Sequence, residues 1–231
     1  MIIEIEGLTK TYPSPAASMP ALDGIDLEIP AGELVALVGK SGSGKTTLLN
    51  MIGGIDRPSA GAVTVAGTAI GALGAGALAR WRGRTVGIVF QFFQLLPTLT
   101  AAENVMLPMD FAGTRPPRER RGRALDRLAR VGVEDQADKL PAALSGGQQQ
   151  RVAIARAIAN DPAVVLADEP TGNLDSSTAR EVFRLFRALA DAGTTVVVAT
   201  HERDLAGVAD RVVTVADGRL GGVPGRAAER A

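Results

Sequence analysis

Apolar and polar residues alternate along the first thirty positions of the chain. Two isoleucines alternate with two glutamates over residues 3–6, so residues 2–11 are expected to form a half-buried strand. Four aliphatic residues recur over residues 22–29, and the Pro-Ala-Gly sequence that follows them is typical of a turn. These two segments predict a small antiparallel β layer at the N-terminal end.

Further along the chain, the apolar residues gather in short uninterrupted runs that alternate with helical patterns. The runs predict strands at 34–38, 86–90, 164–167 and 195–200, and the helical patterns cover 46–52, 145–159 and 177–190. A last pair of strands, at 212–216 and 219–220, flanks Asp217-Gly218, which is a two-residue hairpin signal. This alternation predicts an α/β fold with a mostly parallel sheet.

Residues 95–160 interrupt that alternation with helices and loops. Thr100-Ala101-Ala102-Glu103 is a capping-box sequence, and an arginine-rich helix is expected over residues 116–130. We therefore expect one domain over residues 1–231, with its core at 1–94 and 161–220 and a helical subdomain at about 95–160. The tail at about 221–231 is rich in Gly, Ala and Arg and is expected to be disordered.

A charge-free stretch, residues 58–79, is the one segment that resembles a membrane span. It consists mostly of Ala, Gly and Thr, which contribute little transfer energy, and its scattered glycines disfavour a helix. Val63 and Val65 alternate with smaller or polar residues and predict a strand there. Any association with a membrane is therefore expected to come through a partner.

The charge balance argues against nucleic acid as a partner. The 231 residues include 25 Lys+Arg and 25 Asp+Glu, so the formal net charge is zero, and there is no cysteine for a disulfide or a thiolate metal site. Seven arginines cluster over residues 115–130, interleaved with Glu119 and Asp126 and without aromatic residues. We interpret this cluster as a solvated helix face.

A phosphate-binding loop follows the strand predicted at 34–38. Residues 39–46, Gly-Lys-Ser-Gly-Ser-Gly-Lys-Thr, fit the pattern G-x-x-x-x-G-K-[ST] between a strand and a helix. Gly39, Gly42 and Gly44 let backbone N–H groups approach phosphate oxygens, and the helix adds its positive N-terminal end. Lys45 is expected to reach the β- and γ-phosphates, and Thr46 to bind Mg²⁺. A chance glycine-rich turn is the alternative, and the strand–loop–helix context argues against it.

Two carboxylates, Asp168 and Glu169, follow the apolar run at 164–167. The end of a buried strand is where an α/β sheet presents its ligands, so we expect Asp168 to hold Mg²⁺ and Glu169 to polarise the attacking water. The alternative is that both are ordinary charges at the start of a helix. Pro170-Thr171-Gly172 argues against a helix starting there.

The most selective motif is Leu-Ser-Gly-Gly-Gln-Gln-Gln-Arg at residues 144–151. Ser145 supplies a hydroxyl, and Gly146 and Gly147 supply exposed N–H groups at a helix start, so this end can bind an anion. With the phosphate loop before it and the carboxylates after it, the chain resembles the ATP-binding cassette (ABC) ATPases over residues 2 to about 220. That resemblance implies a P-loop NTPase core, an N-terminal antiparallel layer and an inserted helical subdomain.

The resemblance also implies roles for single residues. His201 corresponds to the switch histidine at the γ-phosphate, and Gln91 to the glutamine that senses Mg²⁺ or the attacking water. Tyr12 corresponds to the aromatic residue that stacks on adenine, with packing at a strand end as the alternative. Asp175 corresponds to the aspartate that couples two sites across a dimer. Nucleotide contacts are also implied for Ser41, Ser43, Thr47 and Gln148.

In this family two ATP molecules are sandwiched in a head-to-tail dimer, where the Ser145 end of one subunit closes over the phosphate loop of the other. The expected cofactors are ATP and Mg²⁺, and the expected partner is a second copy or a similar ATPase. Lys45, Gln91, Glu169 and His201 are then the catalytic residues, and Thr46, Gln91 and Asp168 the metal ligands.

Two segments, 89–105 and 167–175, resemble the branch with lipoprotein-releasing and macrolide-exporting ATPases, with the cell-division ATPase nearby. This implies an integral-membrane permease partner and a place at the cytoplasmic face of the membrane. Five apolar residues after Gln91 are open to core packing or to contact with that permease: Phe92, Phe93, Leu95, Leu96 and Leu99. The rival function is a non-transport ATPase that regulates cell-division or cell-wall machinery. An ABC-type ATPase acting on DNA or ribosomes is disfavoured, because such proteins carry a long insertion or tandem cassettes.

Overall fold

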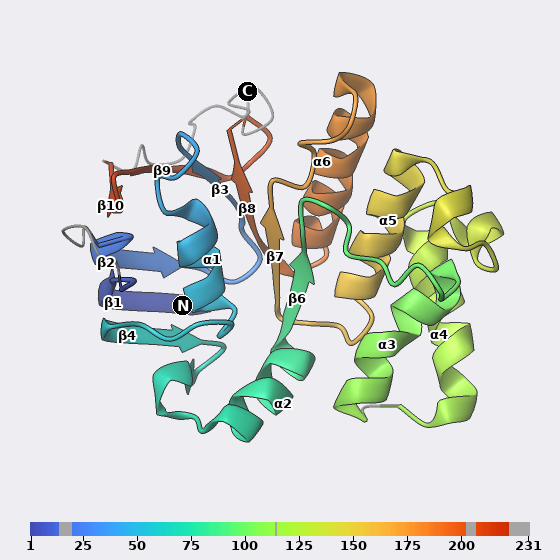
Figure 1. The fold of residues 1–231 in the computed structure, drawn as a ribbon, viewed down its shortest axis with the longest axis horizontal. Coiled ribbons are helices and arrows are strands. Elements are labelled where there is room, and N and C mark those ends of the chain that lie inside the picture. Colours follow the sequence, from blue (N-terminus) through green and yellow to red (C-terminus); the bar gives the residue numbers. More distant parts are fainter. Residues whose placement is uncertain (14–19, 114, 202–206, 222–231) are drawn as a thin grey trace.

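The computed structural model is an α/β protein with two sheets and a separate group of helices (Figure 1). It describes residues 1–13, 20–113, 115–201 and 207–221. The predicted disordered tail lies, apart from Gly221, outside the described residues. The expected P-loop architecture, with an antiparallel N-terminal layer and a mostly parallel core sheet, is confirmed.

The first sheet has the strand order β2-β1-β4-β5 and is antiparallel. Its strands are β1 (Ile3–Lys10), β2 (Leu22–Ile29), β4 (Ala60–Val65) and β5 (Thr68–Ala69). Alternation decides which side is buried: Ile3, Ile5 and Leu8 are at most 2% exposed. The register shifts between Ile5 and Leu8, which keeps both side chains in the core.

The second sheet has the order β10-β9-β3-β8-β7-β6, and all its strands except β10 are parallel. Its strands are β3 (Leu34–Val38), β6 (Val86–Val89), β7 (Val164–Asp168), β8 (Thr195–Thr200), β9 (Arg211–Ala216) and β10 (Arg219–Leu220). The predicted hairpin at Asp217-Gly218 is confirmed, because both residues have positive φ, as a type I′ turn requires.

The parallel sheet separates two hydrophobic cores. Along β7, Val164 and Leu166 enter the core shared with the antiparallel sheet and α1 (Lys45–Ile52), while Val165 and Ala167 enter the core under the helices. Both faces of the strand are therefore covered, which explains why the central strands are continuous apolar runs.

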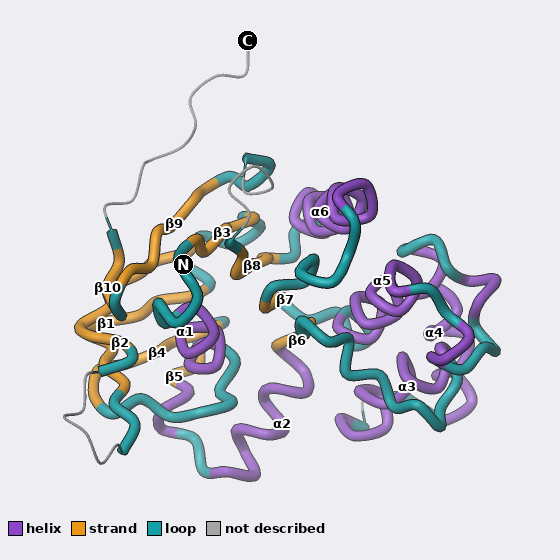
Figure 2. Tube along the Cα trace, turned by 45° about the horizontal axis from the view of Figure 1, so that its top comes forward, coloured by secondary structure: helices purple, strands orange, loops and turns teal. Residues whose placement is uncertain are grey.

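The helices of the second core are α3 (Ala101–Ala112), α4 (Pro117–Arg130), α5 (Gly146–Ala157) and α6 (Ser176–Asp191). Helices α3, α4 and α5 pack on one another beyond β6, and α6 lies against the sheet (Figure 2). Short 3₁₀ turns, Glu134–Gln136 and Pro141–Ala143, connect α4 to α5. The predicted capping box at Thr100 and Glu103 is present at the start of α3.

The sequence argument against a helix in the charge-free stretch is wrong at its end. A 3₁₀ turn, Ile70–Ala72, leads into α2 (Ala75–Thr85), although the strand at Val63 and Val65 is present as predicted. Helix α2 is fixed by tertiary packing, since Leu78 and Trp81 cover Gly54 and Arg82 donates to the Gly54 carbonyl. None of the helices in the described part of the chain is long and apolar enough to cross a membrane.

The interpretation of the arginine cluster as a solvated face is also wrong in part. Arg118 is exposed, but the Arg127 side chain is only 7% exposed and is paired with Asp161, as are Arg115 and Arg123. Burial and the neighbouring arginines lower the pKa of Arg127 to about 10. Further pairs join Arg120 to Asp110 and Arg121 to Asp138. Much of the cluster therefore joins α4 to its surroundings.

Candidate functional site

Four parallel strands bring the predicted site residues to one edge of the sheet. Strands β3, β8, β7 and β6 are neighbours in that order, and the chain leaves their carboxyl ends into the phosphate loop, His201, Glu169 and Gln91. Because parallel strands present their carboxyl ends on one side, these segments converge although they are far apart in sequence (Figure 1).

The phosphate loop needs its glycines for conformation and for close approach. Gly42 and Gly44 have φ of 78° and 108°, which side chains rarely adopt. A Cβ atom on Gly39 would lie 2.2 Å from the Val215 carbonyl oxygen. The Lys45 side chain is 6% exposed and folds back into the loop, where its ammonium donates to the carbonyls of Gly39 (2.8 Å) and Lys40 (3.1 Å). The loop thus encloses a buried cation at the N-terminal end of α1.

Thr46 and Asp168 form a pair of oxygen groups beside the loop. The Thr46 hydroxyl donates to Oδ2 of Asp168 at 2.8 Å, and Oδ1 of Asp168 is buried without a hydrogen-bond partner among the described residues. Burial, with a smaller contribution from nearby Glu169, raises the pKa of Asp168. A buried carboxylate oxygen without a donor and an adjacent hydroxyl fit a magnesium ion, which prefers oxygen ligands and retains several waters.

Glu169 lies between a lysine and a histidine. Its Oε1 is 3.5 Å from Nζ of Lys45, and its Oε2 is 2.8 Å from Nδ1 of His201. The backbone of Glu169 is left-handed, with φ of 44°, and its N–H donates to the Ala199 carbonyl on β8. Such a conformation is uncommon outside glycine and here turns the side chain toward the phosphate loop.

A cavity of about 230 Å³ lies among these groups. It is lined by many of the predicted residues, namely Ser41, Gly42, Gly44, Lys45, Thr46, Thr47, Gln91, Asp168 and Glu169. Ser43 is buried next to Gly39, and its hydroxyl has no partner in the described part of the chain. The arrangement offers donors for phosphate, oxygen ligands for a cation and a carboxylate that can accept a proton.

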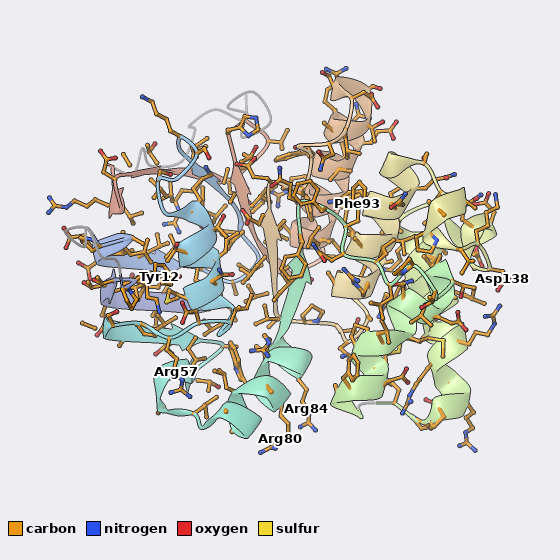
Figure 3. All side chains as sticks on the ribbon, viewed as in Figure 1. Tyr12, Arg57, Arg80, Arg84, Phe93 and Asp138 are labelled. Atoms are coloured by element: carbon orange, nitrogen blue, oxygen red, sulfur yellow. The ribbon has the colours of Figure 1, made fainter. Side chains whose placement is uncertain are left out.

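Tyr12 lies to one side of this cavity, by the antiparallel sheet (Figure 3). Its ring is 43% exposed, its hydroxyl donates to Asp56 at 3.0 Å, and the Lys10 ammonium lies 4.8 Å from the ring centroid. Burial and Asp56 raise the pKa of Tyr12, while a side-chain hydrogen bond with Thr47 lowers it. Asp56 is absent from the sequence prediction, because no motif joins it to Tyr12, which lies 44 positions earlier in the chain.

The Ser145 motif does not line the cavity around Lys45. Ser145 caps α5 through a capping box with Gln148, in which each accepts the other's backbone N–H. A Cβ atom on Gly147 would lie 2.7 Å from the Thr178 methyl group, so this glycine allows α5 to approach α6. Gly146 precedes it in the first turn, where the N–H groups face outward along the helix axis.

Asp175 caps the neighbouring helix, α6. Its carboxylate accepts from the hydroxyls of Ser177 and Thr178 and from their backbone N–H groups, the latter each at 3.0 Å. The hydroxyl bonds, with a smaller contribution from the backbone bonds, hold the pKa of Asp175 well below its usual range. Thr178 also contacts Gly147, so the two helix starts lie together. The structure brings Asp175 to the Ser145 motif, and not into the Lys45 cavity.

A larger groove, about 520 Å³, lies between α2, β6, α3 and α5. Its lining is mostly apolar and includes Phe90, Pro108 and Phe111, of which Phe111 is 85% exposed. Arg80 belongs to its rim, and no carboxylate of the described residues lines it. Arg80 and Arg84 point away from α2 toward open space (Figure 3).

The five apolar residues after Gln91 divide between packing and exposure. Leu95 packs on the core, Phe93 is half-buried and Leu99 is half-buried, whereas Phe92 and Leu96 are 65% and 47% exposed. Core packing therefore holds for Leu95, whereas contact of the exposed Phe92 and Leu96 with a permease stays a prediction.

Comparison with known proteins gives consistent matches. Residues 22–172 match the protein family described as ABC transporter. The chain is 50% identical over 219 residues to the lipoprotein-releasing system ATP-binding protein LolD of Anaeromyxobacter dehalogenans, covering 94% of this chain and 92% of the relative. It is 49% identical over 220 residues to the macrolide export ATP-binding/permease protein MacB of Nitrosomonas europaea, covering 95% of this chain but only 33% of that longer protein.

Solved structures agree with the fold. The dimeric post-hydrolysis state of the ATP-binding cassette MJ0796, bound to ADP and Pi, superposes with a TM-score of 0.89 at 42% identity. The match covers 96% of this chain and 98% of that one.

Proposed function

The chain belongs to the ABC transporter family of ATP-binding cassette ATPases, and on that premise we propose that it is the ATP-hydrolysing subunit of an export or lipoprotein-release system. The observation that carries the proposal is the convergence of Lys45, Glu169 and His201 at one sheet edge. Relatives of matching length include ATP-binding proteins of lipoprotein-releasing systems, and longer relatives include a macrolide export ATP-binding/permease protein. In this proposal the cassette lies at the cytoplasmic face of the membrane through a permease.

When ATP binds, its phosphates lie in the glycine loop. The N–H groups around Gly42 and Gly44 bind phosphate oxygens, Lys45 leaves its carbonyl partners for the β- and γ-phosphates, and Ser41, Ser43 and Thr47 add hydroxyl donors. Tyr12 stacks on the base. Thr46, Asp168 and Gln91 would hold Mg²⁺, which when bound supplies positive charge to the phosphate oxygens.

Hydrolysis depends on Glu169 and its two neighbours. Glu169 accepts a proton from the attacking water, and His201 holds that carboxylate at one oxygen, which fixes its orientation. Lys45 stabilises the charge that develops on the γ-phosphate and its leaving oxygen. Gln91 lies at the same cavity and orients the water.

Dimerisation completes the site. The Ser145 end, with Gly146, Gly147 and Gln148, is a helix N-terminus that does not line the Lys45 cavity of its own chain, and in this proposal it closes over the phosphates of a second subunit. Asp175, packed beside it, couples the two sites. The dimeric cassette structures among the matches support this arrangement for a homodimer or for a pair with a similar ATPase.

We further propose that residues 95–160 form one helical subdomain within a single domain, and that the large groove receives a helical segment of the permease. The apolar lining and the exposed Phe111 favour an apolar face on that segment. The arginines of α2, with no carboxylate in the groove lining described, favour acidic residues beside it.

The test is an affinity pull-down of Glu169→Gln with Mg·ATP from detergent-solubilised membranes of its own host, followed by mass spectrometry. A polytopic permease with a large external domain supports export or release, and recovery of cell-division or cell-wall proteins with a membrane partner supports the rival function. Recovery of ribosomal or DNA-bound proteins without a membrane protein contradicts both.

A charge-reversed control separates the groove from the ATPase. Arg80→Glu with Arg84→Glu, in the Glu169→Gln background, is expected to lose the permease and to retain the ATP-bound dimer. Undiminished recovery of the permease contradicts docking in the groove.

A further inference from the structure

The turn that follows Gln91 is held in an unfavourable backbone conformation. Phe93 and Gln94 are consecutive non-glycine residues with φ of 55° and 54°, in the left-handed region. Residues held there cost of order 1 kcal/mol or more each and persist only where the surroundings fix them. Something outside the turn must therefore hold it in place.

The group that holds the turn is the guanidinium of Arg156. Its Nη2 donates to the Phe93 carbonyl at 2.7 Å, and its Nη1 donates to the Gln94 carbonyl. Burial lowers the pKa of Arg156, and no carboxylate in the described part of the chain pairs with it. A planar fork with two parallel N–H donors suits two adjacent carbonyls, so the contact is specific to arginine.

The other end of the turn is held by a different element. The side-chain amide of Asn173 donates to the Gln91 carbonyl at 3.1 Å, and Gly172 leaves room for the Gln91 side chain. Both residues follow Glu169 in the chain. The turn thus spans two anchors, one on the segment that carries Glu169 and one on α5.

Helix α5 connects Arg156 to the Ser145 motif. It starts directly after Ser145 and ends at Ala157, so its two functional ends are about 15 Å apart along a single helix at a rise of about 1.5 Å per residue. A rotation of the Ser145 end on closing over a partner's phosphates is carried by that helix to Arg156.

From this arrangement we propose that Arg156 is a positioning residue, which ties the orientation of α5 to the turn that carries Gln91. The inference rests on the proposed function, in which Gln91 orients the attacking water. When α5 moves, its guanidinium carries the carbonyls of Phe93 and Gln94 with it, and Gln91 enters or leaves its place at the cavity. Arg156 also lines the large groove, so a partner bound there acts on the same link.

The test is a double-mutant cycle between Arg156→Lys and Gln91→Ala, measured as ATPase kcat. Lysine keeps the charge and loses the two-pronged donor, so Arg156→Lys alone is expected to lower kcat roughly tenfold, the effect of losing one charged hydrogen bond. The Kd for Mg·ATP and the melting temperature are expected to stay near wild type. In the Gln91→Ala background the same change is expected to lower kcat less than about twofold, because coupled residues are non-additive.

Arg151→Lys is the matched control. Arg151 lies on the same helix and also donates to a backbone carbonyl, that of Val131, but it contacts Glu181 and no residue of the turn. The fold-change in kcat caused by Arg151→Lys is expected to be the same in the wild-type and Gln91→Ala backgrounds. If Arg156→Lys lowers kcat by the same factor in the wild-type and Gln91→Ala backgrounds, the inference is overturned. If Gln91→Ala alone has wild-type kcat, the proposed role of Gln91 is overturned instead.

A glycine substitution keeps the test valid if Arg156→Lys lowers stability. Glycine adopts the left-handed conformation without cost, so Gln94→Gly in the Arg156→Lys background is expected to recover part of kcat. If the turn is only a structural element, Gln94→Gly raises the melting temperature without changing kcat, and the inference fails.

Discussion

Nδ1 of His201 lies 2.8 Å from Oε2 of Glu169, and the backbone N–H of His201 reaches the same oxygen at 3.3 Å. One carboxylate oxygen is thus held by the residue that leaves β8, while the other faces Lys45. Two neighbouring strands therefore fix the direction of a single side chain. Since Glu169 is the proposed base, its orientation decides whether it can accept the proton of a water placed to attack the γ-phosphate.

His201→Ala is expected to lower kcat by about a hundredfold or more, within the range for impairing one acid–base group, because Glu169 then loses its shortest side-chain contact. The Kd for Mg·ATP is expected to change little, since His201 is 63% exposed and lies outside the cavity lining. Single-turnover hydrolysis and a nucleotide-binding titration measure the two quantities. A kcat within a few-fold of wild type contradicts the assigned role.

Tyr12→Ala is expected to weaken ATP binding by about 1–3 kcal/mol, the usual contribution of one aromatic–base stack. Tyr12→Phe keeps the ring but loses the hydrogen bond to Asp56, so it separates stacking from that bond. We expect the phenylalanine variant to bind ATP nearly as well as wild type. Equal losses in both variants would show that the hydroxyl, and not the ring, is what matters.

Ser145→Arg is expected to prevent dimerisation without weakening ATP binding to the monomer. A long cation at this end obstructs the approach of a second subunit, and Ser145 is absent from the lining of the Lys45 cavity in its own chain. Nucleotide titration of the monomer and light scattering of the ATP-bound protein give the two readouts. Loss of ATP binding by the isolated monomer argues against a site completed in trans.

Asp161→Ala is expected to destabilise the fold by about 1–3 kcal/mol, because it leaves the buried Arg127 without its carboxylate. This loss of stability is smaller than that for a fully buried ion pair, because Asp161 itself is half exposed. Asp126→Ala, on the exposed side of the same helix, is the control and should have little effect. Denaturant unfolding compares the two, and equal stability of both variants contradicts a structural role for the arginine cluster.

Much of the fold follows from local pattern. The fully buried strands β3 and β8 are continuous apolar runs, and the capping residues Thr100 and Ser145 start helices as their sequences predict. These signals span a few residues, so they can be recognised without knowledge of the tertiary structure.

Features that depend on distant contacts were not predictable. Helix α2 forms in a glycine-rich stretch because Leu78 and Trp81 pack on Gly54, which comes more than twenty positions earlier. Arg127 and Asp161 are similarly far apart, so their pairing is invisible in a helix pattern. The same holds for Asp56 beside Tyr12 and Arg156 beside the Gln91 turn.

In the proposed mechanism, ATP is bound between two subunits and hydrolysed with Glu169 as base. The most direct measurement is the molar mass of Glu169→Gln by light scattering with Mg·ATP, with Mg·ADP and without nucleotide, beside its ATPase rate. We predict hydrolysis below about 1% of wild type, as expected for loss of the base, and a dimer that forms only with Mg·ATP. A variant that turns over ATP at the wild-type rate, or that stays monomeric at saturating Mg·ATP, contradicts the claim.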